Sequence, residues 1–442
     1  MEAVKLKYNT YPSYKDSGVD WLGEIPEHWD AKRLGTHFKE RRTKVSDKDY
    51  KPLSVTKQGI LPQLENAAKS NDGDNRKLVK EGDFVINSRS DRKGSSGISN
   101  EDGSVSLINI VMKPKNFKHA YTNYLLKGYS FIEEFYRNGH GIVADLWTTR
   151  YDEMKNIKIP IPPIEEQTAI ANFLDKKTAK IDKVIAQKEK LIELLKERKQ
   201  ILIQNTVTGK IVWNEKEKVW TEPAEVKDSG VEWIGEIPMG WQVKRLRFLG
   251  YTQNGISAGA DYFGSGYPFV SYSDVYKNIE LPTKVGSLAA SSIEDRKNYS
   301  VKENDVFFTR TSETMDEVGF SSVCFKTIEN ATFAGFLIRF RPTTEKLYKG
   351  FSKYYFSCKI HRGYFTKEMN LVTRASLSQE LLKDLPVLIP SFEEQKEISR
   401  YLETQSTKID KAIALQQTQI EKLKEYKATL IDSAVTGKIK VS

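Results

Sequence analysis

Few residues of this 442-residue chain are spaced for catalysis. The histidines, at 28, 37, 119, 140 and 361, are scattered without metal-ligand spacing, so each is expected to be a surface or capping residue. Cys324 and Cys358 lack the paired spacing of a zinc site and are expected to be half-buried thiols. Asp72-Gly73-Asp74 could offer carboxylates to magnesium, but its Ser/Asn/Gly/Asp-rich surroundings indicate a loop. The sequence therefore predicts no metal site.

Motifs for nucleotides and cofactors are also missing from the sequence. There is no GxxxxGK[ST] loop, no glycine-rich loop after a strand, and no Asn/Asp-Pro-Pro-Tyr signature of an amino-methyltransferase. Pro162-Pro163 is followed by Ile164 and not by an aromatic residue. A self-sufficient nuclease or methyltransferase has no supporting motif, and any catalysis is expected from a partner.

The composition is that of a folded protein with a basic balance. Hydrophobic residues make up 39% and charged residues 29%, and the net charge is +10. No tail or block holds the excess charge, so a DNA-binding surface would have to be assembled by folding. No stretch approaches the roughly 20 apolar residues that span a bilayer, and the N-terminus lacks the apolar core of a signal peptide. A cytoplasmic protein is expected.

The elements that must position any functional residue occur twice. Residues 15–34 and 227–246 agree at 14 of 20 positions at an offset of 212, and residues 159–211 and 387–439 agree at 26 of 53 positions at an offset of 228. The segments between these repeats, 35–158 and 247–386, share almost nothing. Two similar frames thus hold two dissimilar inserts.

Short resemblances inside the inserts predict a common fold. Residues 81–89 can be laid over 303–310, a turn followed by an apolar strand that ends in polar residues and an arginine. Residues 51–56 likewise resemble 267–272. Short alternating runs separated by Gly and Asn indicate a mixed, strand-rich fold with a few short helices, such as one around 121–136. The fold class expected is therefore mixed α/β (α+β).

The second repeated segment predicts a long helix in each half. Pro160, Pro162 and Pro163 precede the first helix, and Glu165-Glu166 suit its first turn. Ser391 and Glu394 have the spacing of a capping box, while Gly209 and Gly437 stand where the helices should end. About 42 residues at 1.5 Å each give a rod of roughly 60 Å.

The apolar pattern of these helices predicts that they pair as an antiparallel coiled coil. One seam position recurs every seven residues, with Val184, Leu191 and Ala412 expected to fill part of the alternate position. Lys188 and Gln416 interrupt the two seams, and antiparallel pairing would bring these interruptions to one level. The pair would then have pseudo-two-fold symmetry, as a bound duplex has. The alternative is two amphipathic helices packed separately on their own domains. The recurring positions are 174, 181, 188, 195 and 202 in the first copy and 402, 409, 416, 423 and 430 in the second.

Two variable inserts in such frames resemble the specificity subunit of a type I restriction-modification system. The resemblance lies in a W-x-G-E-I-P-x-x-W segment before each insert and a P-x-x-E-E-Q helix after it. The matching residues are Trp21, Gly23, Glu24, Ile25, Pro26, Trp29, Trp233, Gly235, Glu236, Ile237, Pro238 and Trp241, followed by Glu165-Glu166-Gln167 and Glu393-Glu394-Gln395. The four tryptophans are expected mainly to pack each frame onto its domain.

The resemblance implies a division of labour along the chain. Residues 1–158 would form target recognition domain 1, 159–211 the first spacer helix, 212–386 target recognition domain 2, and 387–442 the second spacer helix. Each recognition domain would read one half of a bipartite double-stranded DNA site, while the helices hold the domains apart and dock two methyltransferase subunits. Restriction subunits would complete the complex. This chain would hold no cofactor and no metal, because S-adenosylmethionine, ATP and Mg would be used by the partner subunits.

The guanidinium of Arg and the side-chain amides of Asn and Gln can read bases, while Lys, Ser and backbone N–H groups contact phosphates. Polar residues in strand-end or loop contexts are therefore the candidate DNA-binding residues. In the first domain these are Lys57, Gln58, Asn87, Arg89, Arg92 and Lys93, and in the second they are Tyr272, Ser273, Thr309, Arg310, Thr311 and Arg374. The alternative function is a non-catalytic scaffold or decoy that binds a partner through its repeated helices.

Overall fold

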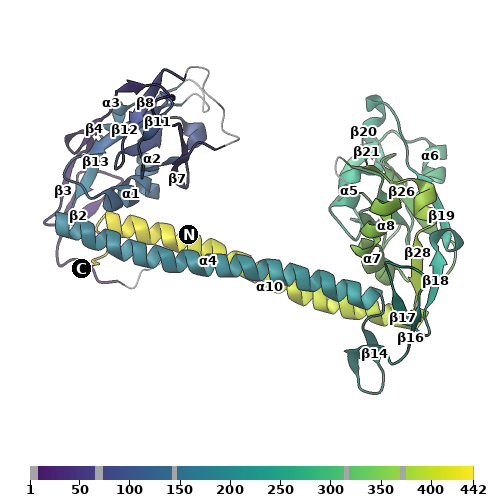
Figure 1. Ribbon diagram of the computed structural model, residues 1–442. Helices are drawn as coiled ribbons and strands as arrows, with labels where there is room; N and C mark the ends of the chain where they lie inside the picture. Colours follow the sequence, from purple (N-terminus) through teal and green to yellow (C-terminus); the bar gives the residue numbers. More distant parts are fainter. Residues whose placement is uncertain (1–7, 65–72, 142–146, 313–317, 369–374, 442) are drawn as a thin grey trace. The chain divides into compact units, whose positions relative to one another are not determined.

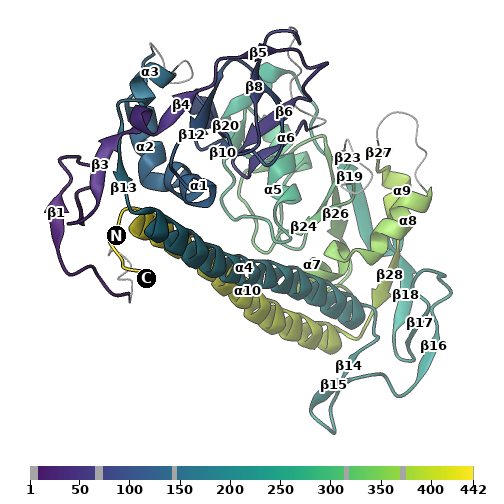
Figure 2. The same ribbon diagram turned by 60° about the vertical axis from the view of Figure 1, so that its left-hand side comes forward.

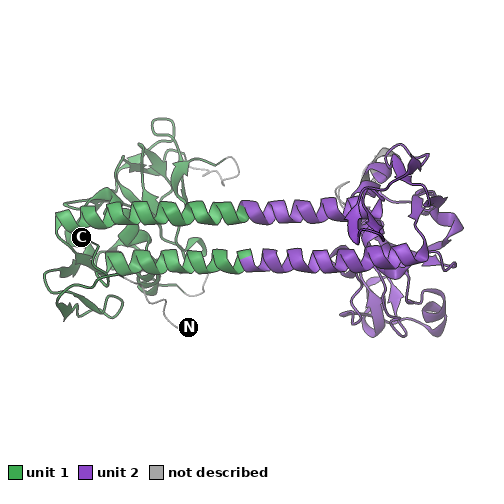
Figure 3. Ribbon diagram, turned by 90° about the horizontal axis from the view of Figure 1, so that it is seen from below, with its two compact units in different colours: residues 1–189, 416–442 green, residues 190–415 purple. Residues whose placement is uncertain are grey.

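The chain folds into two compact units, each of which holds one half of both long helices. A computed structural model describes residues 8–64, 73–141, 147–312, 318–368 and 375–441 (Figure 1). Unit 1 comprises residues 1–189 and 416–442, and unit 2 comprises residues 190–415 (Figure 3). Each unit therefore contains one insert, the start of one long helix and the end of the other.

The two long helices are α4 (Ile164–Val207) and α10 (Phe392–Val435). The capping box at the start of α10 is confirmed, because the Ser391 amide donates to the Glu394 carboxylate over 2.9 Å and the Glu394 amide donates to Ser391 Oγ over 3.3 Å. Gly209 and Gly437 follow the helix ends with φ of 75° and 76°, the left-handed conformation that glycine adopts without strain. The predicted cap of α10 and the predicted glycine ends of both helices are therefore confirmed, whereas residues 159–161 and 387–389, assigned to the spacer helices from sequence, are strands.

The helices pair antiparallel, as the seam interruptions predict. In unit 1, Lys188 Nζ donates to Gln416 Oε1 over 2.9 Å, so the two interruptions share one polar layer. Lys427 Nζ also pairs with Asp182 over 2.7 Å in unit 1, and Lys199 Nζ pairs with Asp410 over 2.7 Å in unit 2. Adding the repeat offset of 228 to Asp182 and Lys199 gives Asp410 and Lys427, so the two ion pairs are equivalent. The two units therefore use equivalent residues, with the roles of α4 and α10 exchanged.

The prediction for the alternate seam position was wrong. Val184 and Leu191 are 39% and 41% exposed, whereas Ile185 and Ile192 are 7% and 6% exposed. The alternate position lies four residues after each seam residue and not three, and in the second copy it includes Ile420, which is 7% exposed. In α4 apolar residues occur at both spacings, and the packing against the partner helix buries those at the spacing of four.

The repeated frame forms a hairpin and a two-stranded ladder in each unit. In unit 1 the hairpin pairs β1 with β2, and β3 pairs antiparallel with β13, which leads directly into α4. The equivalent ladders in unit 2 are β16 with β17 and β18 with β28. The strands are β1 (Tyr14–Asp16), β2 (Glu24–Pro26), β3 (Asp30–Arg33), β13 (Lys158–Ile161), β16 (Val226–Asp228), β17 (Glu236–Pro238), β18 (Gln242–Arg245) and β28 (Pro386–Ile389).

The inserts share a four-stranded antiparallel sheet, which confirms the predicted common fold. Its order is β10-β9-β12-β4 in unit 1 and β24-β22-β26-β19 in unit 2. The central strands β9 (Phe84–Asn87) and β22 (Val306–Thr309) are those aligned from sequence. The other strands of these sheets are β10 (Ser96–Ile98), β12 (Asn109–Pro114), β4 (Phe38–Glu40), β24 (Ser321–Val323), β26 (Leu337–Pro342) and β19 (Gly250–Asn254).

Smaller sheets carry the more divergent parts of the inserts. Unit 1 has a sheet of order β11-β8-β5 and the hairpin β6–β7, and unit 2 has a sheet of order β21-β20-β25. Unit 2 also has the hairpin β14–β15, which lies between α4 and the second frame and outside the insert. Their strands are β5 (Lys44–Val45), β6 (Leu53–Thr56), β7 (Gly59–Pro62), β8 (Arg76–Val79), β11 (Gly103–Val105), β14 (Val212–Asn214), β15 (Val219–Thr221), β20 (Phe263–Val270), β21 (Ser287–Ala289) and β25 (Thr332–Phe333), with β23 (Thr311–Ser312) pairing with β27 (Ala375–Ser376).

Two short helices follow the large sheet in each insert. The single helix expected around 121–136 is instead two helices, α1 (His119–Lys127) and α2 (Tyr129–Arg137), separated at Gly128. A side chain at Gly128 would collide with the carboxylate of Asp432 on α10, so the break lets the chain pass close to the long helix (Figure 2). The corresponding helices of unit 2 are α7 (Lys349–Ser357) and α8 (Ile360–Glu368). The remaining short helices are α3 (Tyr151–Met154), α5 (Tyr272–Tyr276), α6 (Ile293–Asn298) and α9 (Gln379–Lys383).

One histidine and both cysteines lie deeper than expected. His361 is 2% exposed, Cys324 is 1% exposed and Cys358 is 4% exposed, so the surface interpretation was wrong for His361 and the cysteines are fully buried thiols. Burial lowers the pKa of His361 to about 4. No described helix is long and apolar enough to cross a membrane.

Replacing Ile185 should test the corrected seam against the predicted one. Ile185→Ala is expected to lower the free energy of unfolding by about 3 kcal/mol, because it removes a buried seam side chain. Val184→Ala is the matched control and should change it by less than about 0.5 kcal/mol, because Val184 is substantially exposed. Urea denaturation of both variants measures the difference. Equal losses would contradict the register in which Ile185 faces the partner helix.

Acidification should destabilise unit 2 through His361. The folded pKa of about 4 lies below the ordinary 6.5, so the contribution of His361 to stability is present above pH 6.5 and is lost as the pH falls toward 4. The loss should reach about 3 kcal/mol. Urea denaturation across this pH range should show a shallower dependence in His361→Leu than in wild type. An identical pH dependence in the two proteins would contradict the assignment.

Candidate nucleic-acid interface

The Glu-Glu-Gln motif anchors each insert to the start of its long helix. Trp29 is fully buried in unit 1, and its Nε1 donates to Glu166 Oε2 over 3.0 Å. In unit 2, Trp241 is 1% exposed, and its Nε1 donates to Glu394 Oε1 over 3.4 Å. These two tryptophans are core residues, as expected, and they fix the frame of each insert against a helix start.

The glutamine of the motif makes a second anchor. Gln167 is 1% exposed, and its Oε1 accepts the amide of Lys118, the residue that precedes α1, over 3.0 Å. Gln395 is fully buried, and its Oε1 accepts the amide of Tyr348, which precedes α7, over 2.8 Å. An amide side chain can accept this bond and donate another to a backbone carbonyl, which both glutamines do. The first short helix of each insert is thereby fixed to the long helix.

A buried aspartate organises the turn before each central strand. Asp83 is 2% exposed and pairs with Arg41 over 2.6 Å, while Asp305 is fully buried and pairs with Arg341 over 2.6 Å. Arg41 directly follows β4 and Arg341 lies in β26, so the two arginines come from different places in equivalent sheets, yet both pair with the carboxylate. The starts of β9 and β22 are therefore held firmly, and the residues predicted to bind DNA lie at the opposite ends of these strands.

Asn87 and Thr309 occupy equivalent strand ends and lie inside the domains. Asn87 is 6% exposed, and its Oδ1 accepts the amide of Arg89 over 3.0 Å. Thr309 is fully buried, and its Oγ1 accepts the amide of Phe320 over 2.9 Å. This placement argues against the expected base contact for either residue, because their acceptors are already used to shape the following segment.

The segment after Asn87 carries exposed cations. Arg89 and Arg92 are exposed, and among the described residues the one carboxylate paired with Arg92 is that of Asp91, at 3.7 Å. Arg89 lines a hollow of about 400 Å³ together with Arg42, Lys77 and Arg150, which we call the arginine hollow. The carboxylates lining it are Glu40 and Asp152. Four cations against two carboxylates make this hollow suitable for a polyanion.

A second basic hollow is also lined by residues of this segment. Lys57 and Gln58 form the exposed two-residue turn between β6 and β7. Lys57 and Lys93 line a groove of about 730 Å³ together with Lys127 and Lys427, which we call the first-domain groove. Two residues chosen independently from sequence are thus brought into one basic groove.

The second insert brings its candidates together less closely. Tyr272 and Ser273 begin α5, where Ser273 is exposed and Tyr272 stacks on Tyr276 at 5.8 Å between ring centroids. Arg310 and Thr311 are half-buried and follow β22 directly. The remaining candidate, Arg374, lies outside the described residues.

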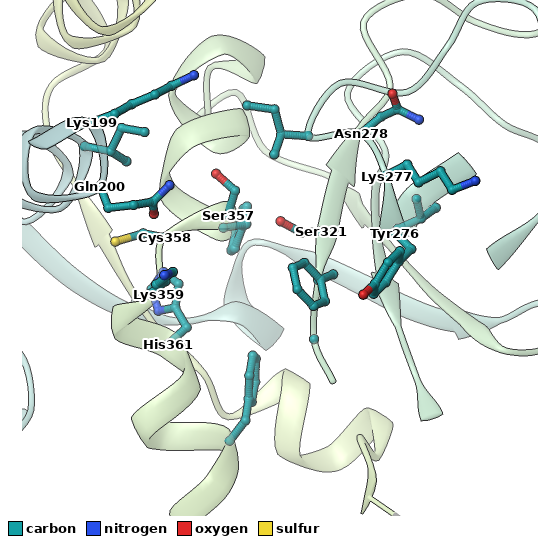
Figure 4. Close-up of a pocket in the computed structure, with 17 residues that line it drawn as sticks. Lys199, Gln200, Tyr276, Lys277, Asn278, Ser321, Ser357, Cys358, Lys359 and His361 are labelled. Atoms are coloured by element: carbon teal, nitrogen blue, oxygen red, sulfur yellow. The ribbon is translucent and has the colours of Figure 1, made fainter. Parts of the chain in front are cut away.

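Unit 2 also has a cavity where its insert meets the long helix. This second-unit cavity measures about 250 Å³, and Lys199, Lys277 and Lys359 border it from different elements (Figure 4). His361 Nδ1 and Ser321 Oγ are buried there without a hydrogen-bond partner among the described residues. Like the first-domain groove, the cavity is lined by lysines.

Sequence reasoning missed several cations of these hollows. Arg42 and Arg150 lie far apart in the chain and meet only through the fold, and so do Lys127 and Lys427. No local pattern distinguishes them from other surface cations. For the acidic stretch, Asp72 lies outside the described residues, and Asp74 accepts a hydrogen bond from Ser46 over 2.6 Å. No cluster of potential metal ligands occurs in the described parts of the chain.

Comparison with known proteins gives a consistent family. A family model described as "Type I restriction modification DNA specificity domain" matches residues 26–194 and 238–425. The chain is 29% identical to the type I restriction enzyme EcoKI specificity subunit of Escherichia coli over 56% of this chain and 50% of that subunit. It is 24% identical to the MjaVIII specificity subunit of Methanocaldococcus jannaschii over 94% of both chains. The match thus spans half of one relative and nearly all of the other.

Solved structures share the fold. One reported for complex assembly and conformational transition of the type I R-M system matches with a TM-score of 0.68 at 15% identity, covering 93% of this chain and 98% of that one. The HsdS subunit from Thermoanaerobacter tengcongensis matches with a TM-score of 0.53 at 17% identity and the same coverage. The mixed α/β architecture with two long helices is therefore that of known structures.

Arg89 and Asn87 should respond differently to alanine substitution. Arg89→Ala is expected to weaken duplex binding about tenfold or more and leave unfolding unchanged within about 0.5 kcal/mol, because the side chain is exposed. Asn87→Ala should instead lower the free energy of unfolding by about 1–2 kcal/mol, because it leaves the Arg89 amide without its acceptor. Binding titrations and urea denaturation separate the two effects. A stable Arg89→Ala protein with unchanged binding would remove Arg89 from the interface.

Proposed function

The chain belongs to the family of type I restriction modification DNA specificity domains, and from this premise we propose that it reads a two-part DNA site. Each insert contacts one half-site, and the helix pair holds the halves at a set separation. One observation carries the proposal: two equal frames present the same sheet with different surfaces. Reading two different half-sites requires the same scaffold in both domains and different side chains on its surface.

Base reading falls to the segments that follow the central strands. Arg89 in the first domain and Arg310 in the second come directly after β9 and β22, where buried Asn87 and Thr309 shape the backbone. A guanidinium can donate two hydrogen bonds to guanine in the major groove. The neighbouring cations Lys57, Arg92 and Lys93 suit phosphate contacts.

The helix pair sets the spacing in this proposal. Each long helix has 44 residues, which at 1.5 Å per residue corresponds to roughly 65 Å. The polar layer and the crossing ion pairs oppose sliding of one helix along the other. A fixed register supports a fixed number of unread base pairs between the half-sites.

The same helices dock two methyltransferase subunits. Exposed charges that recur in both copies support this, since two identical partners need two equal surfaces. The recurring residues are Lys180, Lys183, Glu193, Lys196 and Glu197 in α4, and Lys408, Lys411, Glu421, Lys424 and Glu425 in α10. Restriction subunits complete the complex in the cytoplasm. The chain itself is non-catalytic, and S-adenosylmethionine, ATP and Mg²⁺ serve the partner subunits.

Lengthening the helix pair should lengthen the spacer of the DNA site. Seven residues inserted into α4 after Lys188 and into α10 after Gln416 keep the seam in phase and add about 10 Å, the rise of about three base pairs. Methylation mapping in cells with the methyltransferase should give a bipartite motif whose spacer is longer by about that number. An insertion in α4 alone is the control and should abolish methylation, because it breaks the pairing. A continuous motif, or an unchanged spacer in the double insertion, would contradict the proposal.

A further inference from the structure

The first-domain groove places four lysines on one concave surface within unit 1. Lys57 comes from the β6–β7 turn, Lys93 from the segment before β10, Lys127 from the end of α1 and Lys427 from α10. The groove also exposes the ring of Tyr129, which is 65% accessible. It is therefore a surface shared between the insert and a long helix.

Two of these lysines have no carboxylate to neutralise them. Lys427 pairs with Asp182 over 2.7 Å, and Lys93 pairs with Glu133 over 2.7 Å. Within the described ranges of the chain, no carboxylate lies within ion-pair distance of Lys57 or Lys127. The Lys127 ammonium meets only the Lys57 carbonyl oxygen, at 3.4 Å. The groove thus holds two positive charges in excess.

The charged form of the Lys127 side chain is destabilised in the free protein. Its pKa is lowered, first by burial and then by the nearby charge of Lys427. A partly buried ammonium beside a second ammonium is unfavourable unless an anion joins them. The two ammonium groups therefore lower the stability of the free protein and favour the binding of an anion.

The groove is held in shape by contacts between the insert and α10. Tyr121 Oη donates to the Val435 carbonyl over 3.0 Å, and Ser130 Oγ donates to Asp432 over 3.2 Å. Tyr124 Oη donates to Asp175 of α4 over 2.7 Å. Lys127 and Lys427 are therefore presented together before any ligand arrives, which lowers the entropic cost of binding.

A lysine-lined hollow recurs at the equivalent place in unit 2, with different residues. Lys199 is the repeat equivalent of Lys427 and borders the second-unit cavity (Figure 4). Lys118 and Tyr348 each bond to a motif glutamine, and matching these two residues aligns α1 with α7. In this alignment Ser357 stands at the position of Lys127, and Lys359 at the position of Tyr129. The second-unit cavity is therefore also positively charged, although the lysines that line it stand at partly different positions.

We propose that the first-domain groove binds the phosphate backbone of the duplex beside the first half-site, with Lys57 and Lys127 as the principal contacts. The long helix α10 then contributes Lys427 to the DNA surface as well as setting the spacing. Lysine suits this role because its compact charge attracts phosphate without reading a base. The inference rests on the proposed function, since it assumes that the insert binds duplex DNA.

Salt-dependent binding of the full chain with its methyltransferase tests the groove. A duplex carrying the mapped site is titrated at several salt concentrations with wild type, Lys57→Gln, Lys127→Gln and the double variant. Each substitution should weaken binding about fivefold near 0.15 M salt and make the log–log salt slope shallower by about 0.9, leaving the preference over a scrambled half-site unchanged. Lys422→Gln is the matched control and should bind as wild type, because Lys422 is an exposed lysine of α10 that lines none of these hollows and has no charged equivalent in α4.

Three results would overturn the proposal in different ways. If the wild type is selective and the double variant has the same affinity and salt slope as the wild type, the groove is excluded and the proposed function still stands. Loss of half-site preference in the variants would assign the lysines to base reading. A wild type that selects no duplex would overturn the proposed function and the groove together.

Lysine acetylation in the wild-type complex avoids the variants altogether. Mass spectrometry should show Lys57 and Lys127 protected by the duplex but not by the methyltransferase alone. Protection by the methyltransferase without DNA would make the groove a protein interface and contradict the proposal.

Discussion

The antiparallel direction of the two long helices is the constraint on which the remaining structure depends. In unit 1 the frame is bonded to the start of α4 through Trp29 and Glu166. The end of α10 packs against the same frame, so closely that a side chain at Gly437 would collide with Pro26. In unit 2 the start of α10 and the end of α4 make the equivalent contacts with Trp241 and Pro238. Each frame requires one helix start and one helix end at the same place, which parallel helices do not provide.

Register follows from a polar layer within an otherwise apolar seam. A slip of one heptad would place Lys188 against apolar residues and separate both Asp–Lys pairs, leaving charges partly buried without partners. The polar layer costs some of the stability that apolar residues would give there. In return it excludes alternative alignments, which the proposed spacing of two half-sites requires.

The inserts combine fixed strand ends with variable surfaces. The buried pairs of Asp83 with Arg41 and Asp305 with Arg341 hold the turns before equivalent strands. At the other strand ends, Asn87 accepts the amide of Arg89 and Thr309 accepts the amide of Phe320, which precedes β24. Because these residues act inside each domain, the exposed side chains of the next segment can differ without disturbing the sheet. This separation explains how two unrelated sequences share one strand order.

The sequence by itself determined the features that depend on local chemistry or on repetition. The Ser391 capping box, the glycine helix ends and the shared layer of Lys188 and Gln416 all follow from residue type and spacing, which act over a few residues or recur in both halves. Only the tertiary structure decided which apolar positions of α4 face the partner helix, because Val184 and Leu191 stand three residues after a seam position and Ile185 and Ile192 stand four residues after it. It alone brought Lys127 beside Lys427 and buried His361, since residues 300 positions apart, or a histidine within a short helix, meet their neighbours only when the whole unit packs.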